Sequence, residues 1–268
     1  MSAPVILTDV AQQFSGRGPA RLALDGVDLS VDAGEFVCIV GPSGCGKSTL
    51  LDLVAGHTRP VRGSVEVNGV QVTGPGLDRV MVFQEHALFP WASVRENVGF
   101  GLKNAGMPDA ERAVVVDDWL AKVGLTDAAE LHPHQLSGGM RQRAALARAF
   151  ALRPEVLLMD EPFSALDAPS RDRLHVELQE LWQETGTTII FVTHNVREAV
   201  ALGSRVVVLS SGPGHIIGEV PVRLRRPRVV ESDHVVALAR EVRGLLDAAD
   251  QLGISAPRGG SKDGHVSI

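Results

Sequence analysis

The stretch Gly41-Pro42-Ser43-Gly44-Cys45-Gly46-Lys47-Ser48-Thr49 follows the apolar run Phe36-Val37-Cys38-Ile39-Val40. It fits the pattern G-x-x-x-x-G-K-[ST], which predicts a loop that holds phosphates between a strand and a helix. Glycines let successive backbone N–H groups turn toward one anion, and the following helix adds its positive N-terminal end. We therefore assign residues 41–49 to binding a nucleoside triphosphate, with Lys47 on the outer phosphates and the Ser48 hydroxyl on Mg²⁺.

The composition is that of a globular protein with a sizeable core. Of the 268 residues, 44% are hydrophobic and 22% are charged. The formal charge of −6 argues against nucleic acid as a partner, because nucleic-acid-binding proteins normally carry a basic surplus. Two cysteines, Cys38 and Cys45, indicate a reducing compartment. No apolar stretch approaches the roughly 20 residues that span a bilayer, so we expect any attachment to a membrane to come from another protein.

Two groups of polar residues are interpreted as surface. Arg223, Arg225, Arg226 and Arg228 are expected to form a solvated cluster before the last helix. Seven histidines are expected on the surface or in loops: His57, His86, His132, His134, His175, His215 and His234.

The order of the patterns predicts an α/β core that is interrupted by a helical insert. Residues about 5–40 are expected to form short strands, and residues 63–72 alternate around Asn68-Gly69 as a hairpin does. From about 89 to 153 the patterns are helical, with a capping box at Ser93-Val-Arg-Glu96.

Strand patterns resume after the insert, at residues 156–159 and 188–193. The patterns predict a catalytic domain over residues 5–225, with its insert at about 89–153, and a C-terminal region over residues 226–268. That region is expected to hold one helix, at about 233–249, and a disordered tail.

Asp160 and Glu161 end the fully apolar strand pattern Val156-Leu157-Leu158-Met159. Ligands of a doubly wound sheet bind off the carboxyl ends of its strands, so both carboxylates are expected to face the phosphate loop. Asp160 suits Mg²⁺, directly or through water. Glu161 is placed to hold a water in line with the γ-phosphate as general base. The alternative is an acidic pair that caps the next turn.

Two more polar residues follow strand patterns of the same sheet. His194 ends the pattern at 188–193, and we expect it to contact the γ-phosphate rather than to serve as a structural hydrogen-bonder. Gln84 ends the pattern Val80-Met81-Val82-Phe83, where its amide can touch the metal or the attacking water. The alternative for Gln84 is no role in the site.

A second anion-binding helix start is predicted at Ser137-Gly138-Gly139. It belongs to the insert, on a different layer from Lys47, so one chain cannot easily aim both at the same γ-phosphate. Two copies arranged head to tail can do so. The sequence therefore predicts a symmetric dimer with the nucleotide between the protomers.

Taken in order, these motifs resemble the nucleotide-binding subunit of ATP-binding-cassette (ABC) transporters, over about residues 5–225. They are GPSGCGKST, Gln84, LSGGMRQR, LLMDEP, Ser164-Ala-Leu-Asp167 and Thr193-His194. The resemblance implies an ABC ATPase of the P-loop NTPase class, with a RecA-like core, an antiparallel β subdomain and a helical insert subdomain. It implies that ATP and Mg²⁺ bind, that Ser137, Gly138 and Gly139 contact the partner's nucleotide, and that Asp167 links the two sites.

The chain departs from this family at the adenine. The family usually stacks a tyrosine ahead of the phosphate loop on the base, and this chain contains no tyrosine. Phe14 occupies about that place and keeps a π-face. The alternative for Phe14 is ordinary strand packing.

Three segments are similar to the nitrate, sulfonate and taurine import branch: Phe89-Pro90-Trp91, residues 193–200 and residues 206–216. The resemblance implies a permease partner, indirect action with an extracytoplasmic solute-binding protein, and a place on the cytoplasmic face of the cell membrane. Phe89-Pro90-Trp91 is expected to line a groove that receives a permease helix. The alternative is a loop that packs on itself. We expect import of aliphatic sulfonates, with nitrate, taurine or a related solute as alternatives.

Three rival functions are less well supported. A soluble cassette ATPase of translation or DNA repair usually has two cassettes or a long coiled-coil insertion. An exporter ATPase is usually fused to membrane spans. A P-loop kinase leaves the second glycine-rich helix start without a role.

Overall fold

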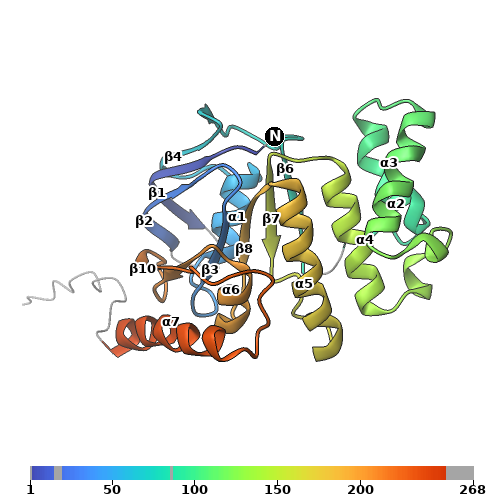
Figure 1. Ribbon diagram of the computed structural model, residues 1–268. Helices are drawn as coiled ribbons and strands as arrows, with labels where there is room; N and C mark the ends of the chain where they lie inside the picture. Colours follow the sequence, from blue (N-terminus) through green and yellow to red (C-terminus); the bar gives the residue numbers. More distant parts are fainter. Residues whose placement is uncertain (1, 15–19, 85–86, 252–268) are drawn as a thin grey trace, which may run out of the picture.

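The computed structural model describes residues 2–14, 20–84 and 87–251. His86 and the expected tail beyond residue 251 lie outside the described residues. Within them, the strands form a four-stranded sheet of order β2-β1-β4-β5 and a six-stranded sheet of order β10-β9-β3-β8-β7-β6 (Figure 1).

The four-stranded sheet is antiparallel. It forms from β1 (Val5–Phe14), β2 (Arg21–Val31), β4 (Arg62–Val67) and β5 (Val70–Gln71). Asn68 and Gly69 connect β4 to β5, and both have positive φ angles, of 55° and 72°. This is the two-residue turn that an Asn-Gly pair favours in hairpins.

The six-stranded sheet is parallel except at its edge strand β10. Its strands are β3 (Phe36–Val40), β6 (Arg79–Val82), β7 (Val156–Asp160), β8 (Thr188–Val192), β9 (Arg205–Leu209) and β10 (Ile216–Pro221). Val192 pairs with both Ile39 and Asp160, so β3, β7 and β8 end at the same edge. The residues that follow these strands are therefore brought together.

The core lies on both faces of this sheet, because neighbouring residues of a strand point to opposite sides. In β3, Val37 and Ile39 pack toward the helix after the phosphate loop and the four-stranded sheet. Phe36 and Cys38 pack toward the remaining helices. Every residue of β3 is buried, which explains its unbroken apolar pattern.

Seven α-helices and two short 3₁₀ turns complete the described part of the chain. The helix after the phosphate loop, α1 (Lys47–Ala55), ends at Gly56 with φ 79°. The insert contains α2 (Val94–Asn104), α3 (Asp109–Lys122), 3₁₀ turns at Thr126–Ala128 and Pro133–Gln135, and α4 (Gly138–Ala151). The others are α5 (Ala168–Thr185), α6 (Val196–Leu202) and α7 (Asp233–Gln251). Figure 1 shows α2, α3 and α4 gathered on one side of the molecule.

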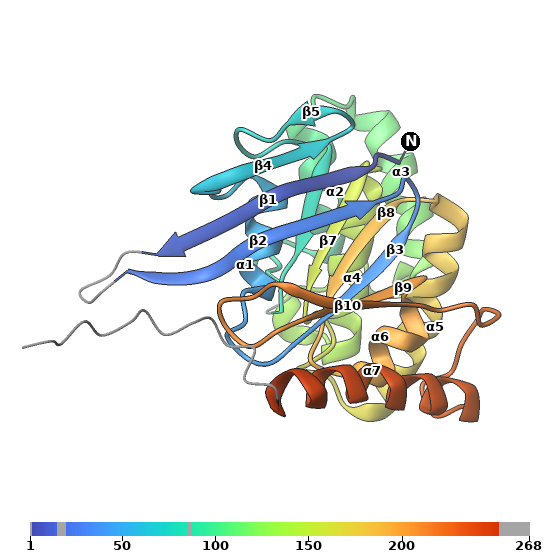
Figure 2. The ribbon, with the colours of Figure 1, turned by 90° about the vertical axis from the view of Figure 1, so that its left-hand side faces the viewer.

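The C-terminal region packs against the core. Helix α7 contacts α6, β9 and β10 (Figure 2). The expectation of a solvated arginine cluster before it is wrong for two of the four residues. Arg228 is buried and donates to carbonyl oxygens of Val200, Gly203, Val222 and Leu224. The carbonyls at the end of α6 need donors, and a cation is favoured there by the helix dipole.

Arg226 is the second exception. Its guanidinium lies 4.4 Å from the centre of the Trp182 ring, and burial lowers its pKa to about 10. Arg223 and Arg225 are exposed, as expected.

Candidate nucleotide site

The phosphate loop (residues 41–49) is a tight turn between β3 and α1 that requires glycine. Gly46 has φ 100°, and a Cβ there would lie 2.6 Å from a methyl carbon of Leu24. A Cβ on Gly41 would lie 2.8 Å from the Cys45 sulfur. The loop borders a pocket of about 370 Å³, lined by Phe14, Arg21, Ala23, Ser43, Gly44, Gly46, Lys47, Ser48, Thr49 and Glu161.

Lys47 lies across this loop. Its ammonium donates to the backbone oxygens of Gly41 and Pro42, each at 2.9 Å. The side chain is 7% exposed, so the charge is held close to the backbone N–H groups of the loop. An anion in the pocket would meet both the ammonium and the N-terminal end of α1.

Ser48 and Asp160 form the pair suited to a divalent cation. Burial raises the pKa of the Asp160 carboxyl, and a hydrogen bond with Ser48 offsets part of this rise. The described residues contain no cluster of three or more His, Cys, Asp or Glu side chains suited to a metal. Mg²⁺ does not need one, because it usually binds one or two carboxylates, the substrate phosphates and several waters. One hydroxyl and one carboxylate beside a phosphate loop therefore fit Mg²⁺.

Glu161 and His194 lie together where β7 and β8 end. The Glu161 Oε2 atom is 2.8 Å from His194 Nδ1. The Glu161 backbone has φ 43°, a left-handed conformation that costs a non-glycine residue about 1–3 kcal/mol. Its N–H donates to Val192, and its carbonyl accepts from the Ser164 hydroxyl, both at 2.9 Å. Glu161 thus lines both the phosphate pocket and a small cavity of about 50 Å³ beside His194.

The structure places Phe14 and Gln84 differently with respect to the pocket. Phe14 is the last residue of β1, lines the pocket and is 48% exposed, so its ring is not committed to core packing. Gln84 is exposed, two residues after β6, and is not among the residues that line the phosphate pocket. Its role stays a prediction.

The serine–glycine turn (residues 137–139) is also absent from that lining. Ser137 caps α4, where its hydroxyl accepts from the Met140 N–H at 3.2 Å, and it is exposed. Asp167 caps α5, and the hydrogen bond from the Ser170 N–H holds the pKa of its carboxyl below the usual range. Ser137 and Asp167 are exposed and available to a second molecule, whereas Gly138 is half-buried and Gly139 is buried.

Sequence reasoning missed two residues near the site. Arg21 lines the phosphate pocket because it pairs with Phe14 across the β1–β2 ribbon, and no local pattern shows this pairing. His175 was expected at the surface, but it is 2% exposed and bonds Glu198. A signal existed, since His175 lies beside Leu174 and three residues before Leu178, on the apolar stripe of α5.

A comparison with protein families identifies this arrangement. The family model described as ABC transporter matches residues 24–164, which include the phosphate loop, the serine–glycine turn and Glu161. The chain belongs to the ABC transporter family. It is an ABC ATPase, with the cassette fold and the activity of hydrolysing ATP.

Several ABC relatives match most of the chain. The nitrate import ATP-binding protein NrtD of Synechocystis sp. is 46% identical over 235 residues, which cover 88% of each protein. The bicarbonate transport ATP-binding protein CmpC of Synechococcus elongatus is 47% identical over 85% of this chain and 35% of its own length. The ABC cassette MJ0796, solved as a dimer in a post-hydrolysis state with ADP and Pi, superposes with a TM-score of 0.73. It is 32% identical and covers 82% of this chain and 100% of its own.

None of the helices within the described ranges of this ABC ATPase combines the length and apolarity needed to cross a membrane.

Proposed function

We propose that two copies of this chain close head to tail on two molecules of Mg·ATP and hydrolyse them between the phosphate loop of one copy and the serine–glycine turn of the other. The observation that carries this proposal is the contact of Glu161 with His194, 2.8 Å apart, at the rim of the phosphate pocket. The serine–glycine turn, whose Ser137 is exposed and which lies outside the chain's own pocket, and the dimeric MJ0796 structure support the second copy.

In this proposal Glu161 accepts the proton of the attacking water as the water oxygen bonds to the γ-phosphorus and the bond from that phosphorus to the β–γ bridging oxygen breaks, which leaves ADP and phosphate. The imidazole of His194 has one nitrogen on Glu161 and keeps Nε2 for the γ-phosphate. Lys47 and the loop N–H groups hold the β- and γ-phosphates, and Phe14 stacks on the adenine. When bound to Ser48 and Asp160, Mg²⁺ neutralises the charge that develops on the phosphate oxygens. Gln84 approaches the metal or water after closure.

Glu161→Gln tests the general base. The amide cannot take a proton, so kcat for ATP should fall at least about 100-fold. ATP affinity should stay unchanged, and an ATP-bound dimer should accumulate on size-exclusion chromatography. Glu155→Gln, just before the opposite end of β7, is the matched control and should keep wild-type turnover. Near wild-type hydrolysis by Glu161→Gln would show that another group is the base.

We further infer that this ATPase energises import of a small anion at the cytoplasmic face of a membrane, where a permease holds it. The import names of the nitrate and bicarbonate relatives support this inference, as do the segments similar to the nitrate, sulfonate and taurine branch. Nitrate is the solute that these relatives favour. The aliphatic sulfonates expected from the sequence have no support among the relatives described above and remain the alternative.

Reconstitution tests the solute. The ATPase would be assembled in liposomes with its permease and solute-binding protein, and hydrolysis measured with nitrate, bicarbonate, taurine or ethanesulfonate outside. We expect nitrate to stimulate hydrolysis most. Stimulation by ethanesulfonate alone would assign the alternative solute, and no stimulation by any of the four solutes would contradict this import role.

A further inference from the structure

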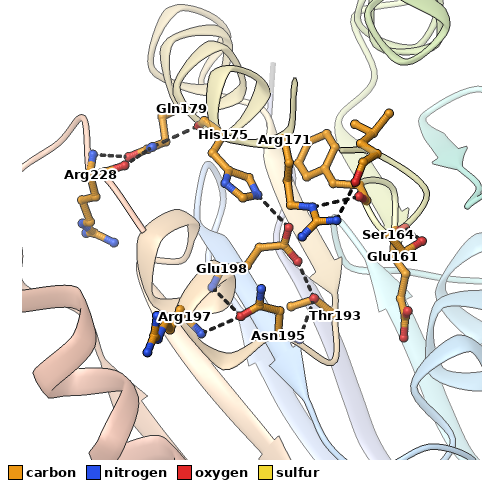
Figure 3. A network of polar contacts seen from close by, with 12 residues as sticks. Glu161, Ser164, Arg171, His175, Gln179, Thr193, Asn195, Arg197, Glu198 and Arg228 are labelled. Carbon is orange, nitrogen blue, oxygen red and sulfur yellow. Dashed lines mark hydrogen bonds and ion pairs between the residues drawn. The ribbon is translucent and has the colours of Figure 1, made fainter. Parts of the chain in front are cut away.

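A buried network of polar groups lies behind His194. Its centre is Glu198, in the first turn of α6, with a carboxylate that is 6% exposed. One oxygen of this carboxylate is 2.7 Å from His175 Nε2, and the other accepts a hydrogen bond from the Thr193 hydroxyl (Figure 3). A carboxylate this deeply buried persists only when its oxygens are well bonded.

The directions of these hydrogen bonds are fixed by their partners. The Asn195 N–H donates to the Thr193 oxygen at 3.0 Å, so the Thr193 proton is free to go to Glu198. For an ionised Glu198, which can only accept, Nε2 of His175 is the donor that completes the set. The N-terminal end of α6 adds a favourable dipole for the negative charge of Glu198.

His194 is held between two residues of this network. Thr193 precedes it and Asn195 follows it, and the Asn195 side chain also accepts from the N–H groups of Arg197 and Glu198, at 3.1 and 3.3 Å. The His194 ring itself is 63% exposed and reaches Glu161 from the open side. Its direction therefore depends on the backbone on either side of it.

The far side of the network is fixed by α5 and the C-terminal region. Gln179 donates to the carbonyls of His175 and Arg228, each at 3.0 Å. Arg171 of α5 lines the same small cavity as Glu198 and Glu161, and its guanidinium donates to the carbonyls of Phe163 and Leu166. The support behind Glu198 is thus bonded to the core on several sides.

We propose that Glu198 is a positioning residue that, through the Thr193 hydroxyl, sets the His194 ring for contact with Glu161 and the γ-phosphate. This inference rests on the proposed role of His194. Glu198 is not among the residues that line the phosphate pocket, so losing the link should lower kcat and leave the KM for ATP unchanged. A residue that serves stability alone would change the melting temperature without lowering kcat at an unchanged KM.

Thr193→Val tests the link, because it removes the hydroxyl and keeps the shape. Thr188→Val is the matched control. Thr188 lies on β8, at the end away from His194, and is as buried as Thr193. Its hydroxyl also makes two hydrogen bonds, because it donates to the Ala3 carbonyl and accepts from the Gly34 N–H. Both variants should lose some thermal stability. Only Thr193→Val should lower kcat, by about tenfold or more at unchanged KM, and Thr193→Ser should restore it.

Two outcomes separate this inference from the proposed function. His194→Ala is measured in the same series and should be nearly inactive; an active His194→Ala would overturn the role of His194 and with it the inference. An inactive His194→Ala beside a fully active Thr193→Val would overturn the inference alone. Equal losses of kcat in Thr193→Val and Thr188→Val would also overturn it, because the effect would then follow stability.

Discussion

The Lys47 side chain is already positioned at the phosphate loop when no anion is bound. Its ammonium bonds two carbonyls of the loop that it serves, which satisfies a nearly buried charge. Phosphate offers that charge a stronger, ionised acceptor at nearly the same place. The residue is thus held against the loop that we propose binds ATP.

Lys47→Ala should therefore weaken ATP binding strongly. Hydrogen bonds to charged groups contribute about 1.5–3 kcal/mol, which corresponds to a rise in the Kd for ATP of about 10- to 100-fold. Titration with a fluorescent ATP analogue measures it. Lys122→Ala is the control, since Lys122 lies on α3 in surface ion pairs with Asp118 and Glu184. Equal affinities of the two variants would contradict the role assigned to Lys47.

Elements with local causes could be predicted from the sequence. The capping box at Ser93 is present with both of its hydrogen bonds. Helix α7 runs from residue 233 to residue 251, against expected bounds of about 233 and 249. Caps, glycines and apolar periodicity act within a few residues, so they can be recognised in a single sequence.

Contacts between distant elements could not be predicted. The sequence predicts Arg228 to be one of four surface arginines, but it donates to carbonyls at the end of α6. No local pattern shows that these two segments meet. The pairing of Arg21 with Phe14 depends in the same way on the register of two long strands. By contrast, Asp160 and Glu161 were predicted to face the phosphate loop because every parallel strand of such a sheet ends at one edge, and Asp160 bonds Ser48 while Glu161 lines the phosphate pocket.

At the scale of the molecule, a second surface is set apart from the nucleotide. A groove of about 510 Å³ lies in the insert between α2 and α3, and its lining includes Phe89, Trp91 and Phe100. Phe89 and Phe100 pack together with ring centres 4.4 Å apart, while Trp91 is 75% exposed. Part of the segment is thus self-packed, and its tip is exposed, with the Trp91 ring centre 5.4 Å from that of Phe89. The segment between β6 and α2 contains Gln84 and joins this groove to the nucleotide edge of the sheet.

Trp91→Ala should therefore weaken assembly with the permease without weakening the fold. An exposed aromatic beside an apolar groove has the features of an interface anchor, whose loss typically costs at least about 2 kcal/mol, or about 30-fold in affinity. Co-purification with the tagged permease from detergent measures the loss. Val114→Ala, which removes a 69% exposed apolar side chain of α3 outside the groove lining, is the control. If both variants assemble fully, the permease binds elsewhere, and the groove does not couple hydrolysis to transport.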